Sequence, residues 1–445
     1  MTRILLVGSW DPPFLTVARS CARQGAKAYF LELGARRCLW RWYTSCLAGG
    51  SATEAEGEQV IDAIRDYAAA VRAQGIVSCD EPRLLWLAQR RERLERECKL
   101  LAPSLETLNF LYSKRCQIQL AAKVGFRLLP TVYVLSHDDV GCVPANLYPV
   151  IVRPDDKWKL TSPFKFALAY SASELHRVVD HQDGAALVVQ PFHNWPNLVV
   201  HGARTLEGKL LTLKAFLVER KFQGMTLTIT PMECPPDVED HCREFADACG
   251  VVGSFHYELL YSPRDGRTYF LELNGRLGGT TDKVTALGFD ETHYHLSAFD
   301  LLPPPESQTL GRRVAANKGV LLKHVVSGLR GNLTALDYPN KQIGSQAAVI
   351  TRDLLLAKDS VLDWRDLRGS LWMQLGPQRR DGMRKSSSLL STRTALPAPA
   401  QPKRSQTGKR WVSRLTSIRT VDKTWDLLLP YVLVGAHSRL PVVLL

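Results

Sequence analysis

Two apolar strands that each carry a carboxylate, joined by a tight turn, constrain this chain more than any other feature. The first strand is His256-Tyr-Glu-Leu-Leu260 and the second is Tyr269-Phe-Leu-Glu-Leu-Asn274. Asp265-Gly266 lies between them and is a strong signal for a hairpin turn. The turn predicts that the two strands are antiparallel neighbours in one sheet, and that their acidic positions meet.

The hairpin brings three oxygen-bearing side chains to one place. Residues i and i+2 of a strand point to the same face, so Glu272 and Asn274 share a face, and strand pairing adds Glu258. Two carboxylates and an amide oxygen suit a hard cation such as Mg²⁺, which fills its other positions with phosphate and water. Arg276 follows on the same line and offers a planar fork to phosphate oxygens. His256 is expected to point to the opposite face from Glu258 and to be packed or hydrogen-bonded.

The alternative is that these acids face solvent on an ordinary amphipathic hairpin. We disfavour it because the acids interrupt strands that are otherwise apolar or aromatic. Two further strands, Val150–Pro154 and Ala186–Gln190, also carry charged or amide residues near their ends. The ends of apolar strands are where α/β proteins place their ligands.

The first 105 residues alternate between strand-like and helix-like patterns, which predicts βαβ units and a parallel sheet. No G-x-G-x-x-G motif follows the first strand, which argues against a dinucleotide site. Residues 235–250 are expected to form a helix, and another helix is expected to start at Asp363. The segments of the N-terminal part are Ile4–Val7, Leu15–Gln24, Ala28–Glu32, Glu54–Gln74 and Gly75–Cys79.

The net charge of +13 is concentrated near the C-terminus. From Pro377 onward there are 13 Lys or Arg and 3 Asp, a net charge of +10, which leaves +3 for the first 376 residues. A nucleic-acid-binding body is therefore not indicated. Residues 379–423 could contact an anionic membrane surface or nucleic acid, or form a solvated extension. The apolar end, 427–445, is interrupted by Pro430 and Pro441 and is a poor transmembrane span.

The remaining composition indicates a globular protein of several domains. A length of 445 residues exceeds what one core usually organises. The first residues fit a strand better than a signal peptide. The ten cysteines include no C-x-x-C pair, so we expect reduced thiols, no zinc site and a cytoplasmic location.

Glu258 and the stretch Phe270-Leu-Glu-Leu-Asn-Gly-Arg-Leu-Gly-Gly279 resemble the metal-binding E … E-x-N-x-R signature of the ATP-grasp superfamily. Three upstream stretches resemble further parts of that pattern, in the family's order. They are Ser113-Lys114 with Gly125–Thr131, then Tyr148-Pro-Val-Ile-Val-Arg-Pro154, then Val188-Val-Gln-Pro-Phe192. The similarity covers about residues 104 to 304.

The resemblance implies an α/β fold class, with an N-terminal Rossmann-like domain before a two-lobed ATP-grasp fold that has an α+β lid. It also implies binding of ATP with Mg²⁺ or Mn²⁺. The implied metal ligands are Glu258, Glu272 and Asn274. The implied catalytic residues are Lys114, Arg153 and Arg276. The implied ATP-binding residues are Lys114, Arg153, Gln190, Pro191, Phe192, Lys214 and Arg276.

Together with the changes in composition, the resemblance divides the chain into four parts. Residues 1–105 form the N-terminal α/β domain, and residues 106–304 form the ATP-grasp domain with its lid at about 128–190. Residues 305–376 form a mixed α/β extension. Residues 377–445 form a basic, Pro- and Ser-rich linker with an apolar tail, largely disordered or amphipathic.

The chain departs from the family pattern at several positions. Arg153 stands where lysine is usual, Pro191 replaces the hinge acid, and Ser113 replaces an aspartate. Residues 155–165 contain no glycine, whereas many relatives cover the phosphates with a glycine-rich lid. Either lysines take the place of the lid amides, or the segment is a solvated charge run. The lysines concerned are Lys157, Lys159 and Lys165.

The activity implied by the resemblance is transfer of the γ-phosphoryl group of ATP to a small carboxylate, followed by attack of an amine on the acyl phosphate. Two alternatives stay open. One is a carbamoyl-phosphate-synthase-like or carboxylase-like enzyme that phosphorylates bicarbonate. The other is a non-catalytic ATP-binding adaptor with a basic tail. Neither the identity of the substrates nor the oligomeric state, including a homo-oligomer, follows from the sequence.

Overall fold

A computed structural model of the chain describes residues 1–8, 11–33, 47–52, 58–96, 98–156, 164–180, 185–306, 310, 314–340 and 343–375. All of them belong to a compact unit, Met1–Gly376. None of the helices in these ranges has the length and apolar character needed to cross a bilayer. The predicted basic segment 379–423 lies outside the described residues, as do Lys157 and Lys159.

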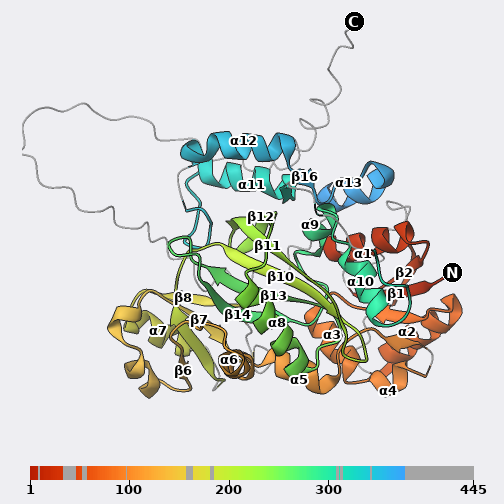
Figure 1. The fold of residues 1–445 in the computed structure, drawn as a ribbon, viewed down its shortest axis with the longest axis horizontal. Helices are drawn as coiled ribbons and strands as arrows, with labels where there is room; N and C mark the ends of the chain where they lie inside the picture. Colours follow the sequence, from red (N-terminus) through yellow and green to blue (C-terminus); the bar gives the residue numbers. More distant parts are fainter. Residues whose placement is uncertain are drawn as a thin grey trace, which may run out of the picture. The chain divides into compact units, whose positions relative to one another are not determined.

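The N-terminal part forms the predicted parallel sheet (Figure 1). Its strand order is β3-β2-β1-β4-β5, and every pair of neighbours runs parallel. The strands are β1 (Arg3–Gly8), β2 (Lys27–Leu33), β3 (Leu47–Ala52), β4 (Gly75–Val77) and β5 (Lys99–Leu100).

Helices cover both faces of this sheet because alternate residues of β1 are apolar on both sides. Ile4 and Leu6 pack with α1, while Leu5 and Val7 pack in the second core with α2 and α3. The helices are α1 (Pro12–Arg23), α2 (Glu58–Val71), α3 (Glu81–Ala88) and α4 (Arg91–Leu94).

A smaller antiparallel sheet follows, with strand order β6-β9-β7-β8. Val150 and Val152 of β7 point into its core with helix α7, so Arg153 between core positions faces the other way. The elements are β6 (Val132–Val134), η2 (Asp138–Cys142), η3 (Ala145–Leu147), β7 (Val150–Pro154), β8 (Ala167–Ala169), α7 (Ala172–Val179) and β9 (Leu187–Pro191).

The central sheet has strand order β14-β13-β10-β11-β12-β15-β16. Its longer strands are β10 (Asn197–Arg204), β11 (Leu210–Phe222), β12 (Met225–Met232), β13 (Gly253–Tyr261) and β14 (Thr268–Asn274). Two short strands complete one end of the sheet, β15 (Ala315–Ala316) and β16 (Lys358–Asp359).

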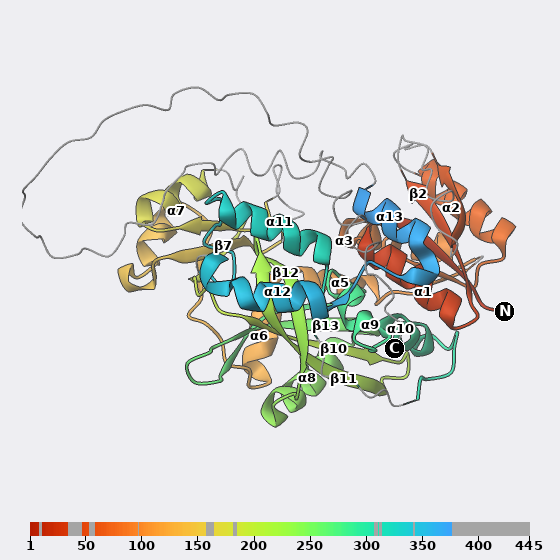
Figure 2. The ribbon, with the colours of Figure 1, turned by 90° about the horizontal axis from the view of Figure 1, so that it is seen from above.

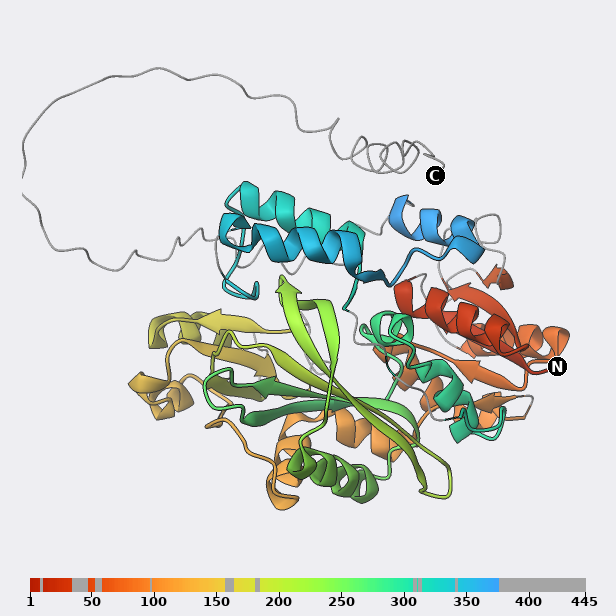
Figure 3. The same ribbon diagram turned by 45° about the horizontal axis from the view of Figure 1, so that its top comes forward.

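Helices lie on both faces of the central sheet. Figure 3 shows α8, the helix predicted for residues 235–250, along one face. On that face Phe245 of α8 packs with Tyr257 and Phe270. On the other face Val199 and Phe216 pack with the region of α9 and α10. The helices are α5 (Leu105–Tyr112), α6 (Lys114–Lys123), α8 (Pro236–Cys249), α9 (Thr281–Ala286) and α10 (Glu291–Ala298).

The last described part is mainly helical, and α11 and α12 lie side by side (Figure 2). The predicted helix start at Asp363 is confirmed, since its carboxylate accepts from the Arg365 amide at 2.9 Å before α13. The elements are α11 (Lys318–Leu329), η5 (Ile343–Gln346), α12 (Ala347–Leu356), η6 (Trp364–Asp366) and α13 (Leu367–Leu375).

Candidate active site

The predicted hairpin is present, with β13 and β14 antiparallel on either side of Asp265–Gly266. Glu258 lies opposite Glu272, and His256 lies opposite Asn274. Gly266 has a φ of 70°, a left-handed conformation that glycine adopts at little cost. The pairing therefore brings the three predicted metal ligands together.

Alternate residues of the hairpin separate this polar site from the core. Tyr257, Leu259 and Leu273 are buried in the cluster that includes α8. Because side chains of a strand alternate between faces, Glu258 and Glu272 project from the opposite face. The site is thus built on a strand pair whose other side is firmly packed.

The expectation that His256 points away from Glu258 is wrong. The two residues are two positions apart on β13, so their side chains share a face. The expected packing of His256 is confirmed, because it is 4% exposed and its ring stacks on His201 with centroids 5.2 Å apart. Burial, with some contribution from His201, lowers the pKa of His256 to about 3.

Glu272 makes contacts with cations on one side and with an amide on the other. The Lys114 ammonium donates to its carboxylate, and Nη1 of Arg153 lies 4.0 Å from Oε2. Nδ2 of Asn274 donates to Oε1 at 3.2 Å. Burial alone would raise the pKa of Glu272, but Lys114 and Arg153 outweigh it and hold the pKa well below its usual value. Glu272 is therefore an anion at neutral pH.

Glu258 is the less satisfied of the two acids. Nδ2 of Asn197 donates to its Oε2 at a long distance of 3.5 Å. Burial and then repulsion from Glu272 raise the pKa of Glu258, while Lys165 and Lys114 oppose the shift. A cation between the two carboxylates would relieve this repulsion. Together with the Asn274 oxygen, the two acids form a donor set that fits Mg²⁺.

Lys114 is positioned by the start of helix α6. The Ser113 hydroxyl caps the helix by accepting from the Cys116 amide at 3.2 Å. Asp155, which follows β7, accepts from the Ser113 hydroxyl at 3.1 Å and from the Arg115 amide at 2.7 Å. Ser113 thus does the capping that an aspartate could do, and it ties Lys114 to the end of β7.

Arg153 continues a polar chain through the smaller sheet. Its Nη2 donates to Oε1 of Gln190 at 2.7 Å, and Nε2 of Gln190 donates to the Thr131 hydroxyl at 2.9 Å. Pro191 pairs with Val150, and the Phe192 amide donates to the Pro149 carbonyl at 2.8 Å. The hinge stretch 190–192 therefore lies beside residues 149–151, and its Gln190 side chain reaches Arg153.

Arg276 joins the acidic pair to the N-terminal sheet. Its Nη2 lies 3.4 Å from Oε2 of Glu81, at the start of α3. Burial would lower the pKa of Arg276, but attraction to Glu81 and to further acids, Glu272 among them, outweighs burial and raises it. The guanidinium remains charged between the two parts of the fold.

Lys214 is not brought into this group by any contact among the described residues. It lines a separate open cavity of about 640 Å³ with residues of β12 and α8, among them Glu239, and with Glu233 between these two elements. Of the two lysines on β11, Lys221 is the one near Glu258. It donates to the Trp195 carbonyl at 2.6 Å and lies 3.3 Å from Oδ1 of Asn197. Burial lowers the pKa of Lys221 to about 8.

Sequence reasoning did not select Asn197, Lys221 or Glu81 as site residues. Asn197 opens an apolar strand, and this polar residue at a strand end was the one available signal. The pairing of β11 with β12 shifts register twice just before Lys221. The sequence therefore does not show which face of the sheet Lys221 occupies. Glu81 reaches the site only through the docking of α3 near Arg276.

No family model matches the chain. Mitochondrial acetyl-CoA carboxylase of Saccharomyces cerevisiae (strain ATCC 204508 / S288c) is 26% identical over 200 residues, which are 38% of this chain and 9% of that protein. Acetyl-CoA carboxylase 2 of Oryza sativa subsp. japonica is 41% identical over 64 residues, 14% of this chain and 3% of that protein. The matched part therefore covers less than a tenth of either relative.

Solved structures share the fold over most of the chain. N5-carboxyaminoimidazole synthetase of Staphylococcus aureus with ADP has a TM-score of 0.54 and 13% identity, covering 69% of this chain and 79% of that one. The L-amino acid ligase of Bacillus licheniformis has a TM-score of 0.52 and 16% identity, covering 69% and 75%.

A third solved structure with the same fold holds a magnesium nucleotide. It is the biotin carboxylase domain of Hydrogenobacter thermophilus 2-oxoglutarate carboxylase, in complex with MgADP, ADP and bicarbonate. It has a TM-score of 0.52 and 14% identity, covering 67% of this chain and 69% of that one.

Proposed function

Because the chain has the ATP-grasp fold, we propose that it is an ATP- and magnesium-dependent ligase that joins a small carboxylate to an amine through an acyl phosphate. One observation carries the proposal. Glu258 and Glu272 lie side by side on one hairpin face with Asn274. The side chains of Lys114 and Arg153 both approach the carboxylate of Glu272. Acids next to cations at a strand pair suit a metal-bound polyphosphate.

In the proposed site, Glu258, Glu272 and Asn274 hold Mg²⁺ or Mn²⁺, which neutralises charge on the ATP phosphates. Lys114 and Arg153 bind those phosphates. Nε of Arg153 is a buried donor with no acceptor among the described residues, so a phosphate oxygen would satisfy it. The hinge, residues 190–192, contacts the adenine. Lys214 is not included among the ATP-binding residues, because it lines a separate cavity. Lys221, which lies beside Asn197, takes the place of Lys214 in the proposed site.

The side chains would act mainly by position and charge. A carboxylate oxygen of the substrate attacks the γ-phosphorus, and the bond to the ADP oxygen breaks. Arg276 stabilises the charge that develops on the transferred group. The amine nitrogen then attacks the acyl carbon, phosphate leaves with the bonding electrons, and the nitrogen loses a proton. No covalent protein intermediate is required.

A second candidate keeps the site and changes the substrate to bicarbonate. The similarity to acetyl-CoA carboxylases and to a structure holding bicarbonate favours it. The two candidates differ in a simple measurement. Bicarbonate alone would stimulate phosphate release in the second case, whereas the first requires an organic carboxylate and an amine.

The test combines a substrate screen with one matched pair of variants. The chain is assayed for phosphate release with Mg²⁺, ATP and pooled amino acids or small carboxylates, and the products are identified by mass spectrometry. Glu272→Gln removes a ligand charge and should weaken MgADP binding about tenfold or more. Glu219→Gln, the same change on β11 away from the acidic pair, should leave binding unchanged.

Two results would count against the proposal. If Glu272→Gln hydrolyses ATP as fast as the parent with saturating co-substrate, the assignment of the metal site is wrong. If every pool gives the same phosphate release while MgADP still binds, the adaptor function is favoured.

Contact of the basic segment 379–423 with an anionic membrane surface or nucleic acid remains a prediction, as does the formation of a homo-oligomer. Deleting residues 377–445 tests the segment. If it has no role, the truncated chain should keep its ATPase activity and its binding to anionic vesicles or nucleic acid unchanged.

A further inference from the structure

The loop that carries Arg276 runs from Gly275 to the start of α9 and has little side-chain bulk of its own. At Gly278 an added Cβ would lie 2.4 Å from Cε1 of His256 and 3.1 Å from Nη1 of Arg276. Gly278 therefore packs closely against the imidazole and the guanidinium. A shift of Gly278 would therefore change a close contact of the Arg276 guanidinium.

A buried carboxylate holds this loop. Glu291, in the first turn of α10, is fully buried, and its Oε2 accepts from the Thr281 hydroxyl at 2.6 Å. The same hydroxyl accepts from the Gly278 amide at 2.9 Å. Glu291 thus fixes Gly278 through one intervening hydroxyl.

The second oxygen of Glu291 fixes the loop through a histidine. Oε1 lies 2.9 Å from Nδ1 of His201, and Nε2 of His201 lies 3.0 Å from the Thr280 hydroxyl. His201 thus links the Glu291 carboxylate to the Thr280 hydroxyl, and each of these groups has a partner. Burial would raise the pKa of Glu291, but His201 and the Thr281 hydrogen bond outweigh it and lower the pKa.

Helix α10 is itself anchored on its other side. Asp290 accepts from the Ser20 hydroxyl and pairs with Arg23 of α1, 3.2 Å from its Nη2. The Ser254 hydroxyl donates to the Glu291 carbonyl at 3.0 Å. Glu291 is therefore held from the N-terminal domain and from the central sheet at once.

A metal site in this cluster is the competing explanation. His201, His256 and Glu291 each offer a ligand atom, and these atoms lie within 4.8 Å of one another. The two imidazole planes are nearly parallel, at 22°, so their in-plane lone pairs run side by side and do not converge on one point. Both nitrogens of His201 are also engaged by Glu291 and Thr280.

We propose that Glu291 is a positioning residue which, through Thr281 and His201, holds the loop 275–281 so that Arg276 can contact the transferred phosphoryl group. The role of Arg276 rests on the proposed function, whereas the hold on the loop does not. The two parts can therefore fail separately.

The experiment uses the full chain and a matched pair of Thr→Val variants. Thr281→Val removes the linking hydroxyl, and Thr292→Val removes a hydroxyl that is equally buried but has no partner among the described residues. Both substitutions keep nearly the same shape. Amide hydrogen exchange of the loop should become up to about tenfold faster in Thr281→Val and stay unchanged in Thr292→Val. Thr281→Ser should restore slow exchange.

Binding of Mg²⁺ with a non-hydrolysable ATP analogue, which carries the phosphoryl group that is transferred, tests the link to Arg276. Thr281→Val should weaken binding about tenfold, with Thr292→Val within about twofold of the parent. In an Arg276→Met background, Thr281→Val should cause no further loss, because the hydroxyl acts through Arg276.

Three results separate the ideas. If the two Thr→Val variants exchange alike, the hold on the loop is refuted. If exchange differs but Thr281→Val still weakens binding in the Arg276→Met background, Glu291 does not act through Arg276. If the parent does not bind the ATP analogue with Mg²⁺, the proposed function fails, while the exchange data still decide the hold on the loop. If Thr281→Val does not fold, Thr280→Val provides the same exchange test through His201.

Discussion

At the scale of single residues, Asp11 shows how burial in the N-terminal domain changes the chemistry of a common helix cap. Its Oδ1 accepts from the Phe14 amide at 3.1 Å at the start of α1. Burial, with repulsion from Asp80 and Asp282, raises the pKa of Asp11 to about 7, although the Phe14 amide and Arg276 oppose the shift. The folded chain therefore keeps a proton there that the unfolded chain releases near pH 4.

We expect Asp11→Asn to stabilise the chain more at pH 8 than at pH 5. The raised pKa of Asp11 stabilises the folded chain below pH 4, and this stability is lost as the pH rises through 7. Asparagine keeps the cap and does not ionise. The advantage of the variant should grow by about 2 kcal/mol between the two pH values, measured as the difference in unfolding free energy from the parent. An equal difference at both values would contradict the assigned pKa shift.

At the scale of elements, the sequence predicted the strand pairing that the local turn and the periodicity of the strands determine. The Asp265–Gly266 turn and the two-residue periodicity were enough to pair Glu258 with Glu272. The same periodicity places His256 on the face of Glu258, so the wrong expectation for His256 came from misapplying it. Glu81 could not be predicted, because its contact with Arg276 joins residues 195 positions apart through tertiary packing.

A glycine in the turn between β13 and β14 and a glycine in strand β10 should respond to alanine for different reasons. Gly266 has a φ of 70° and little around it, so Gly266→Ala should cost about 1 kcal/mol through backbone strain alone. At Gly202 an added Cβ would lie 2.5 Å from the Phe255 ring, so Gly202→Ala should cost more, about 2–3 kcal/mol. Denaturant unfolding measures both. A larger cost at Gly266 would show that the turn, and not core packing, limits the stability of this sheet.

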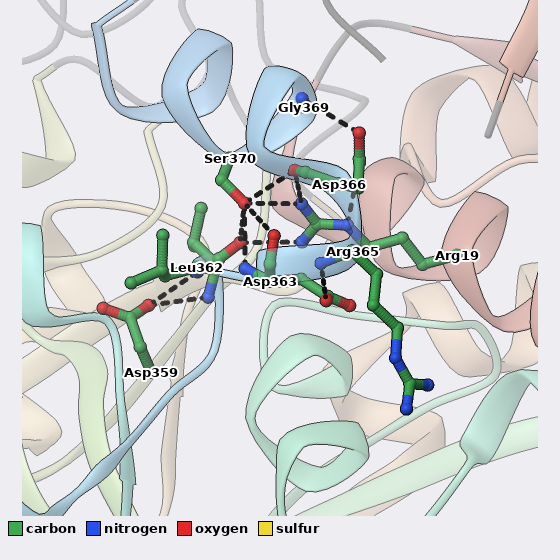
Figure 4. A network of polar contacts seen from close by, with 9 residues as sticks. Arg19, Asp359, Leu362, Asp363, Arg365, Asp366, Gly369 and Ser370 are labelled. Carbon is green, nitrogen blue, oxygen red and sulfur yellow. Dashed lines mark hydrogen bonds and ion pairs between the residues drawn. The ribbon is translucent and has the colours of Figure 1, made fainter. Parts of the chain in front are cut away.

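At the scale of the whole described unit, the C-terminal part is fixed to the N-terminal domain by a buried ion pair (Figure 4). Nε of Arg19 on α1 lies 3.0 Å from Oδ2 of Asp366, 347 residues away. Nη1 donates to the Val361 carbonyl at 2.7 Å, and Nη2 donates to the Ser370 hydroxyl at 2.9 Å. No sequence pattern within residues 305–375 indicates this contact, because its two partners are 347 positions apart and meet only through tertiary packing.

Breaking the pair from one side should be more damaging than replacing both partners. Arg19→Met leaves the Asp366 carboxylate, 2% exposed, without its cation and should cost about 3–5 kcal/mol. The double variant Arg19→Met/Asp366→Leu leaves neither charge buried and should recover a large part of that loss. Arg365→Met, which changes an exposed side chain of the same segment, should stay within about 0.5 kcal/mol. The unfolding free energies of the parent, of Arg19→Met, of Asp366→Leu and of the double variant form a double-mutant cycle. Hydrogen exchange over residues 359–375 shows whether the loss of stability occurs in the C-terminal part. If the double variant is as unstable as the sum of the two single ones, Arg19 and Asp366 are not coupled, and the C-terminal part must be held by its apolar contacts instead.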